Sequence, residues 1–491
     1  MSRPDNGWFQ SIARQFAGID LRSLAAFRIG LGVVLLWDLS TSLGSASAFY
    51  SNDGFLPLSV LDKFRESPWM WSIHAWSGSS AWQIALLILH MAAAVCVLAG
   101  YRTQVSAFVC WALLCSLLAR NPTIQHSGDV ALRLLCFWGM FLPLGARWSV
   151  EERRGRISTF SEAGRISTFA SFGILLQVCL IYWMSALLKD GVEWRRDGSA
   201  VYYALSLDQF VTGAGRSLLR FPALCRVFTF GTWWLEVVGP IVALFTFRTP
   251  VLRVLIVAIF FSLHAGLWIS FRLGPFAPTM LTAWLLFLPP AFWDAVEKRC
   301  RCVPRSASPT SGGHERQQWM RHPLTQWFSL VCIVYVTLWN LRGANIKHHD
   351  KWFPQWVNPF GYVLYLHQYW TMFAPRPTTD DGWVIMEAVL ANGARVDLLR
   401  DGRPVSFEKP ALISAEFRDS KWQKAILSLW PSLYRHMRPS FGNYMAFQWN
   451  DTHSPSEQIR GWTLWYMRED TLPHGAQAKP VKIEMLRAGR M

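Results

Sequence analysis

Charged residues are scarce in this chain. Only 16% of its 491 residues are Asp, Glu, Lys or Arg, whereas soluble proteins average about 25%. This scarcity excludes a disordered chain, and it argues against an ordinary soluble domain. Hydrophobic residues make up 52% of the sequence and gather in long blocks between short Arg-rich links. Such blocks are typical of a polytopic membrane protein.

Several site signals are also missing. No cysteine follows Cys332, so the C-terminal region has no disulfide framework. No Gly-rich phosphate-binding loop occurs, and His348-His349 is an adjacent pair without further ligands at useful spacing, so we predict no metal site. The net charge of +16 could indicate nucleic-acid binding, but the excess Arg lies in the links, where it sets topology. We therefore expect no nucleic-acid partner.

The apolar blocks predict about nine membrane-spanning helices, with an uncertainty of one. A helix crosses the hydrocarbon layer with about 20 residues, so the third and fourth blocks are the doubtful ones. The nine blocks are Leu24–Leu43, Ala81–Gly100, Ser106–Leu118, Val130–Leu144, Phe169–Leu188, Phe228–Phe247, Val251–Ile269, Ala277–Phe292 and Gln326–Leu341. We expect an all-α polytopic membrane protein with a small α+β extramembrane C-terminal domain.

The Arg-rich links predict the orientation of these helices. The link after the fourth span carries five arginines and the link after the eighth carries six basic residues, and a nine-span count places both links on the N-terminal side. Positive residues favour the cytoplasm, so we expect residues 1–23 inside and the C-terminal domain outside a bacterial plasma membrane. The link Asp190–Arg226 is Arg-rich yet should face outward, which makes it a candidate functional loop.

The N-terminal block could also be a signal peptide cleaved after Ala46-Ser47-Ala48. Arg28 and Asp38 bracket its apolar core and argue against that reading.

The composition changes after about Arg342, which divides the chain into a transmembrane domain at 24–341 and an outer domain at 342–491. Asn392-Gly393 and Asp401-Gly402 separate β-prone runs and are strong hairpin signals. We predict a three-stranded meander there, an amphipathic helix over Lys421–His436 and two later strands. The three meander strands and the two later ones are Trp383–Leu390, Arg395–Leu399, Val405–Phe407, Trp462–Met467 and Val481–Met485.

Ionisable residues at membrane depth are costly and are candidate functional residues. Lys189, His126 and His264 should converge on the outer leaflet, and a desolvated lysine there could act as a base. The structural alternatives are a lysine that snorkels to the interface and a histidine hydrogen-bonded within the core. Five others could simply pair and fix helix packing: Arg28, Asp38, Asp129, Arg133 and Glu236.

Six stretches in order resemble the HTTM (horizontally transferred transmembrane) family, whose members are related to vitamin K-dependent γ-glutamyl carboxylase. The stretches are Leu24–Gly30, Gly100–Thr103, His126–Asp129, Phe141–Val150, Leu188–Trp194, and His264 with Phe271–Phe276. The resemblance implies that a lysine deprotonates a reduced quinone. Oxygen then generates a strong base that removes a γ-proton from a protein-bound Glu, to which carbon dioxide adds.

By this resemblance, Lys189 is the catalytic base, while His126 and His264 stabilise quinone oxyanions. Tyr182, Trp194 and Phe271 are the candidate cofactor-binding residues, and the cofactor would be vitamin K or menaquinone hydroquinone. The chain departs from the carboxylases in having Ser206-Leu207-Asp208 where they carry a basic and aromatic stretch. The large region that binds their propeptide also has no counterpart here. The acceptor is therefore expected to differ.

Two non-catalytic functions remain open. The Trp-rich outer segment could engage a periplasmic or secreted partner as a scaffold, although aromatic residues are equally favoured at a membrane surface. The tryptophans are Trp352, Trp356, Trp370, Trp383, Trp449, Trp462 and Trp465. A transporter is disfavoured because the two halves show no internal repeat.

Overall fold

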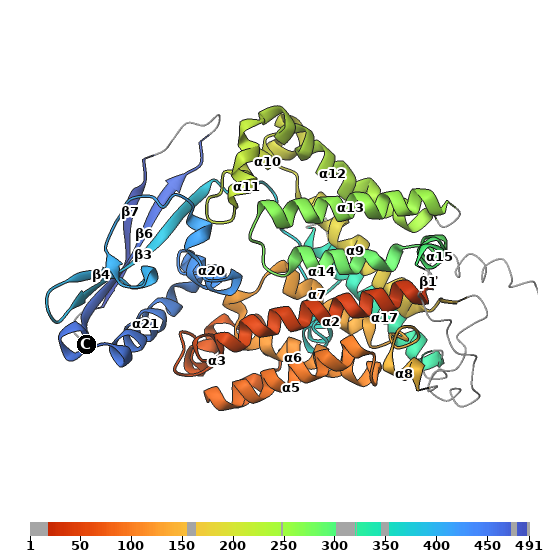
Figure 1. Ribbon diagram of the computed structural model, residues 1–491, viewed down its shortest axis with the longest axis horizontal. Coiled ribbons are helices and arrows are strands. Elements are labelled where there is room, and N and C mark those ends of the chain that lie inside the picture. Colours follow the sequence, from red (N-terminus) through yellow and green to blue (C-terminus); the bar gives the residue numbers. More distant parts are fainter. Residues whose placement is uncertain are drawn as a thin grey trace, which may run out of the picture.

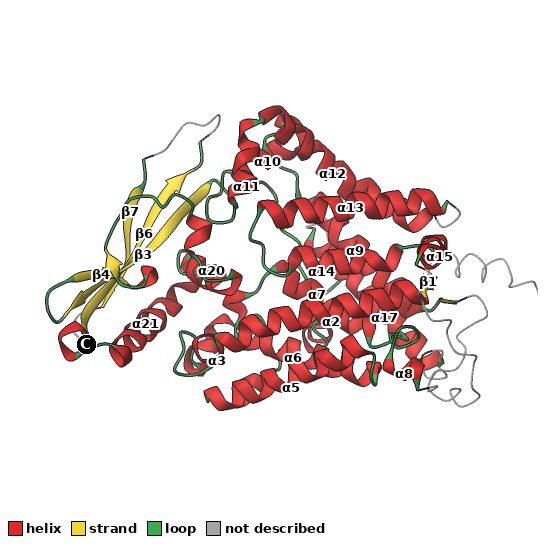
Figure 2. Ribbon diagram, in the orientation of Figure 1, coloured by secondary structure: helices red, strands yellow, loops and turns green. Residues whose placement is uncertain are grey.

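A bundle of long helices carries a β-sheet region at one end, as the sequence colouring of Figure 1 and the red and yellow ribbons of Figure 2 show. The computed structural model describes residues 18–154, 164–246, 249–300, 320, 322–344, 353–472 and 479–488. The expected inner segment up to residue 17, the His348-His349 pair and Trp352 lie outside the described residues.

Seven described helices are long and apolar enough to cross a membrane: α2 (Leu21–Gly44), α5 (Ser80–Ala99), α6 (Thr103–Arg120), α9 (Phe169–Leu188), α12 (Pro222–Phe245), α13 (Pro250–Ser270) and α17 (Pro323–Gly343). Capping side chains fix where two of these helices begin. Asp20 and Thr168 cap the N-termini of α2 and α9 with side-chain oxygens, which satisfy backbone N–H groups that have no partner inside the helix.

The expected count of nine spans lies above this number for two reasons. The block Ala277–Phe292 is divided between α14 (Phe276–Trp284) and α15 (Pro290–Arg299), and the chain bends by 96° between them, at Pro289 and Pro290. The block Val130–Leu144 becomes α7, Ser127–Gly139, with only 13 residues, or about 20 Å at 1.5 Å per residue. Counting the bent pair as one span gives eight.

The described flanks of two Arg-rich links, α8 (Val150–Arg153) and α15 (Pro290–Arg299), lie at the end of the bundle opposite the sheet (Figure 1). The two-residue strands β1 (Ile19–Asp20) and β2 (Arg165–Ile166) pair there, which joins the N-terminal segment to the link before α9. Arg22 also forms ion pairs with Asp294 and Glu297 of α15. Residues 19–22 and the described flanks of the links after the fourth and eighth expected blocks therefore lie on one side of the bundle.

The C-terminal part holds a five-stranded antiparallel sheet in the order β5-β4-β3-β6-β7. Its strands are β3 (Asp380–Leu390), β4 (Arg395–Asp397), β5 (Arg403–Pro404), β6 (Ile459–Asp470) and β7 (Val481–Ala488). The predicted meander and both later strands are present, although the third strand lies at Arg403–Pro404 rather than Val405–Phe407. Gly393, at φ +87°, turns the first hairpin in a conformation that favours glycine.

The predicted helix Lys421–His436 is wrong in its extent. Helix α20 covers only Ser420–Leu427, and a 3₁₀ segment at Ser432–Met437 leads into α21, Arg438–Thr452. Pro431 separates α20 from that segment, since proline disfavours a helical conformation in the residue before it. The amphipathic pattern correctly placed α20, but it did not reveal α21.

Short helices complete the chain: α3 (Ala46–Tyr50), α4 (Leu58–Leu61), α8 (Val150–Arg153), α10 (Ala200–Leu205), α11 (Gly213–Ser217) and α19 (Asn358–Val363). The segment after α19 re-enters the bundle. Gln368 is buried and hydrogen-bonds Gln177 in the middle of α9 at 2.7 Å, while Arg133 of α7 donates to the carbonyl of His367. Residues 365–370 thus pack among the long helices although the composition changes before them.

Candidate functional site

Lys189 ends helix α9 and lies in a buried ion pair. Its Nζ is 2.5 and 2.6 Å from the two carboxylate oxygens of Glu236 on α12, and 2.9 Å from Oγ of Ser185. The two charged side chains are only 4% and 8% exposed. The lysine therefore does not snorkel to the interface, and both Glu236 oxygens face one ammonium group.

Tyr182, Ser185 and Lys189 share one face of α9 because they are spaced i, i+3 and i+7. Two turns from Lys189, or about 10 Å along the helix axis, the Tyr182 hydroxyl is 2.6 Å from Nε2 of His264. Trp284 donates its indole N–H to the same hydroxyl at 2.7 Å. We call Tyr182, Ser185, Lys189 and their partners Glu236 and His264 the α9 site.

The outer end of the α9 site is covered by the chain that follows the last span. The Trp194 ring lies 4.7 Å from Lys189 Nζ, and its indole N–H donates to the carbonyl of Phe373 at 2.9 Å. Gly191 donates to the carbonyl of Pro375 at 3.1 Å. Phe271 packs against Phe373 at a ring distance of 5.8 Å, so it reaches Trp194 through Phe373. Trp194 is therefore an immediate neighbour of the lysine, whereas Phe271 is one layer farther out.

His126 lies beside the α9 site rather than in it. Its Nε2 is 3.1 Å from the carbonyl of Ser420, and a Cβ on Gly274 would come within 3.0 Å of its ring. His264 packs against Phe276 at a ring distance of 5.7 Å, so the two histidines flank residues 274–276. Burial, helped by Lys424 and Lys421 nearby, lowers the pKa of His126 to about 3. His126 is therefore neutral at physiological pH and acts only as a hydrogen-bonding group.

Three of the remaining candidates contact the backbone rather than one another. Arg28 donates to the carbonyls of Val97, Leu98 and Trp148. Asp129 accepts from the backbone N–H of His126 at 2.7 Å. Arg28 and Arg133 thus satisfy backbone carbonyls, which is a common way to compensate a buried guanidinium.

A second buried lysine pair was not predicted. Lys421 of α20 lies 2.8 Å from Asp38 of α2, and Asp129 and Tyr50 interact with it electrostatically. Nearby, His90 of α5 is fully buried, and neither ring nitrogen has a hydrogen-bond partner among the described residues. His90 could have been found as an ionisable residue inside an apolar block. Lys421 lies on a short helix far along the chain, and no local pattern connects it to Asp38.

The outward-facing Arg link is anchored rather than free. Arg195 donates to the carbonyl of Lys189 at 2.9 Å and lies 4.9 Å from the ring of Trp233. Arg216 forms an ion pair with Asp208. Both arginines are therefore held by neighbouring groups of the described chain.

The α9 site has the chemical groups that a quinone-type ligand would need. Nδ1 of His264 is buried and has no hydrogen-bond partner among the described residues, so a ligand oxygen could satisfy it. The His264 ring contacts Tyr182 and Phe276, and Tyr182 in turn packs against Phe260 and Trp284. The unpartnered Nδ1 and the neighbouring aromatic rings are groups that suit an aromatic ligand carrying oxygens.

Comparison with known proteins adds no relative: no family model, no curated protein and no solved structure matches the chain.

Proposed function

We propose that this chain is a membrane-embedded enzyme of the carboxylase type, which binds a reduced quinone and uses the Lys189–Glu236 pair as its base. One observation carries the proposal: a buried lysine–carboxylate pair lies two turns along α9 from the Tyr182–His264 hydrogen bond. Perturbed ionisable groups beside a set of aromatic rings are a common feature of active sites. The resemblance to the HTTM family supports the same reaction class.

The Lys189–Glu236 pair can accept one proton overall. The ammonium can first give a proton to Glu236, which leaves a neutral amine and a neutral carboxylic acid. Burial raises the free energy of the ion pair, because both charges lose their hydration. The neutral pair incurs no such cost, so the free-energy difference between the two states becomes smaller. The amine then takes a proton from the ligand. The carboxylate can instead take that proton directly. Both routes end with an ammonium beside a neutral acid and an anionic ligand.

Neighbouring groups hold the pair in position. Ser185 accepts a hydrogen bond from Nζ at 2.9 Å, and the Trp194 ring provides a favourable face for the ammonium at 4.7 Å. The unpartnered Nδ1 of His264 would bind an oxygen of the ligand. Together with oxygen, bound reduced quinone would supply the strong base that removes a carbon-bound proton from the acceptor.

The same proposal includes a location. The Arg-rich end of the bundle would face the cytoplasm of a bacterium, and the sheet would face the periplasm or exterior. The seven long apolar helices support a multi-pass protein in the lipid bilayer. The outer end of the α9 site, with Lys189 and Trp194, would then face a periplasmic or secreted protein acceptor.

The test uses the full chain purified in detergent. Binding of menaquinone hydroquinone and oxygen-dependent epoxide formation are measured for wild type, Lys189→Ala and Glu236→Gln. We expect saturable binding by all three and at least about 100-fold slower epoxide formation in both variants, because general-base contributions have this size. Lys298→Ala, an exposed position on α15, is the matched control and should behave as wild type.

Two results would contradict the proposal. If wild type does not bind the hydroquinone, the protein is not a quinone enzyme. If it binds and Lys189→Ala keeps the wild-type rate of epoxide formation, the base lies elsewhere.

The scaffold function has less support in the outer part of the chain. Trp370, Trp383 and Trp462 are at most 2% exposed and belong to the core. Trp356 is 79% exposed, but a single exposed tryptophan is also typical of a membrane-surface anchor.

A further inference from the structure

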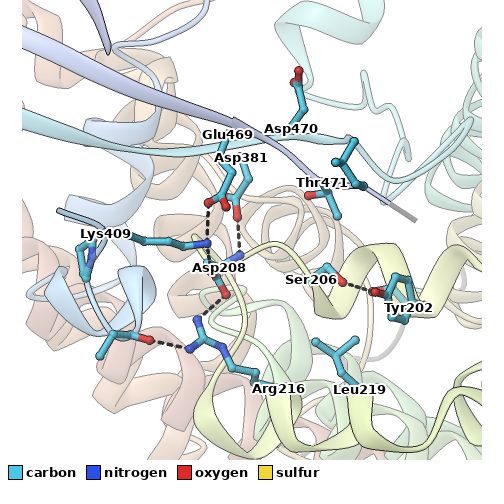
Figure 3. A pocket seen from close by; sticks show the side chains of 13 residues that line it. Tyr202, Ser206, Asp208, Arg216, Leu219, Asp381, Lys409, Glu469, Asp470 and Thr471 are labelled. Atoms are coloured by element: carbon cyan, nitrogen blue, oxygen red, sulfur yellow. Dashed lines mark hydrogen bonds and ion pairs between the residues drawn. The ribbon is translucent and has the colours of Figure 1, made fainter. Parts of the chain in front are cut away.

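A separate cavity of about 420 Å³ opens between the outward link and the edge of the sheet region. Asp208 and Arg216 reach it from the link, while Asp381 of β3, Lys409 and Glu469 of β6 reach it from the C-terminal part. Figure 3 shows the side chains of Asp381 and Glu469 pointing toward Lys409 and Asp208. We call this cavity the link–sheet pocket.

The two cations in the pocket wall already have partners. Lys409 forms ion pairs with Asp208 at 2.7 Å and Glu469 at 2.5 Å. Arg216 pairs with Asp208 and also donates to the carbonyl of Ala411 at 2.5 Å. These groups therefore offer little attraction to an anionic ligand.

The carboxylates of the wall outnumber its cations. Asp208, Asp381, Glu469 and Asp470 line the pocket against only Lys409 and Arg216. Asp381 accepts hydrogen bonds from the backbone N–H groups of Asp208 at 2.7 Å and Gly382 at 2.9 Å. No ion pair within the described ranges gives Asp381 a cation. Asp470 shares Arg468, outside the lining, with Asp380, so the wall keeps an excess of negative charge.

The rest of the lining is apolar enough to hold an alkyl chain. Tyr202 and Leu219 form the link side, and Leu472 lies at the opposite wall with 37% of its surface exposed. A tyrosine ring also attracts a cation through its face. The pocket therefore combines a negative interior with hydrocarbon and aromatic walls.

We infer that the link–sheet pocket binds an ammonium or guanidinium group carried on an alkyl chain. Such a ligand would place its charge near Asp381 and its methylene groups against Leu219 and Leu472. A charge loses its hydration on entering a pocket, and an opposite charge there offsets that loss. A lysine or arginine side chain of a peptide and a free aliphatic amine share this chemistry. The inference does not depend on quinone chemistry in the α9 site.

The test measures binding to the full chain in detergent at pH 8.5, where Asp381 is ionised, by calorimetry with two amines and one anion as probes. The blocked peptide acetyl-Lys-Lys-Lys-amide represents a peptide source, and spermidine represents a free amine. Glutarate is the anionic control. We expect saturable binding of at least one amine, weaker at high salt because ions screen the attraction, and no binding of glutarate. Binding of the peptide alone would identify a peptide side chain as the ligand, and binding of spermidine alone would identify a free amine.

Variants locate the binding. Asp381→Asn should weaken amine binding at least tenfold, while Asp451→Asn, an exposed aspartate on α21, should leave it unchanged. Because Asp381 is buried and its replacement could disturb folding, Leu472→Lys provides a second test at the rim. Its own ammonium should compete with the ligand, whereas Leu472→Ser should not.

Three outcomes would overturn the inference. They are no binding of either amine by wild type, equal binding of glutarate, or unchanged amine binding in both Asp381→Asn and Leu472→Lys. Loss of amine binding with intact epoxide formation would leave the proposed enzyme function in place. Amine binding by a wild-type protein that forms no epoxide would overturn that function and leave the amine pocket in place.

Discussion

Two buried lysine–carboxylate pairs each join two helices of this chain, and the groups around the two pairs differ. Lys189 has one carboxylate, Glu236, together with a serine hydroxyl and a tryptophan ring. Lys421 has Asp38 at 2.8 Å, with Asp129 and Tyr50 nearby. Both pairs are almost fully buried, but only the second has a further carboxylate, Asp129, near its cation.

This difference distinguishes Lys189, the proton carrier of the proposed function, from Lys421, which we call the anchor because it joins α20 to the helix bundle. Burial alone would lower the pKa of Lys421, but the ion pair with Asp38 and the nearby Tyr50 and Asp129 outweigh it and raise that pKa. Lys421 is thus held as a permanent cation that fastens α20 to the helix bundle. Lys189 faces one carboxylate, and in the proposed function this pair carries the proton.

The largest expected effect is the loss of the anchor. Lys421→Met leaves Asp38 buried without a cation and should lower the free energy of unfolding by about 3–5 kcal/mol. Chemical denaturation in detergent, followed by tryptophan fluorescence, measures it. Lys479→Met, at an exposed lysine, is the control and should change stability little. A similar stability for Lys421→Met and wild type would show that Lys421 is not an anchor.

The anchor also has a defined pH dependence. Because the folded pKa of Lys421 is raised above the unfolded value of 10.5, its contribution to stability is fully present below about pH 10.5. The contribution is lost as the pH rises through the folded pKa. The titration of Lys421 should therefore add no pH dependence to wild-type stability from pH 6 to 9, and a pH-dependent difference from Lys421→Met would report Asp38, which that variant leaves buried without a cation.

Asp381 extends the comparison to a buried carboxylate with no cation. Burial, with Asp208 nearby, raises its pKa from 3.8 to about 7 against two backbone hydrogen bonds that lower it. The folded state therefore binds a proton between pH 3.8 and 7 that the unfolded state has released, so stability falls as pH rises through this window. The fall amounts to at most about 4 kcal/mol, since one pKa unit is worth about 1.4 kcal/mol.

Asp381→Asn should remove this part of the pH dependence. The measurement is the thermal midpoint in detergent between pH 4 and 8, for wild type, Asp381→Asn and the control Asp451→Asn. The wild-type and control midpoints should fall relative to that of Asp381→Asn as the pH rises. Parallel curves for all three proteins would mean that Asp381 titrates normally.

The α9 pair should respond differently when both charges are removed together. Replacing a buried ion pair by apolar residues is often neutral or stabilising. Lys189→Met combined with Glu236→Leu should therefore keep wild-type stability or gain up to about 2 kcal/mol, while epoxide formation is lost. The matched double variant, Lys421→Met with Asp38→Leu, should remain less stable than wild type because Asp129 loses one of its nearby cations and keeps Arg133 and Lys424. Equal stability changes in the two double variants would remove the distinction between proton carrier and anchor.

Long helices were predictable because their signal is local. The apolar block Phe169–Leu188 coincides with α9, which begins after the capping Thr168 and ends at the polar Lys189. Helix α7 was predicted too far along the chain because the apolar residues continue past Gly139, where the helix ends. A run of apolar residues indicates that a segment is buried or lies in lipid, but it does not indicate where the backbone hydrogen bonds of a helix end.

The partners of the site residues were less predictable. Lys189 and Glu236 were both recognised as ionisable residues at membrane depth, but their pairing depends on how α9 packs against α12. Lys421 was assigned to an outer amphipathic helix, and its contact with Asp38 joins positions far apart in the sequence. A sequence pattern identifies which residues need a partner, but packing decides which partner they receive.

The smallest expected effect comes from an ion pair without burial. Arg395 lies 3.1 Å from Glu387 on the sheet, a distance close to that of the anchor, but its side chain is 70% exposed. Water screens such a pair, so Arg395→Ala should cost less than about 1 kcal/mol. Glu387 also keeps a hydrogen bond from Trp465 at 2.8 Å, which limits the loss further. A double-mutant cycle with Glu387→Gln isolates the pair. A coupling energy as large as the effect of Lys421→Met would show that distance, rather than burial, decides what these ion pairs contribute.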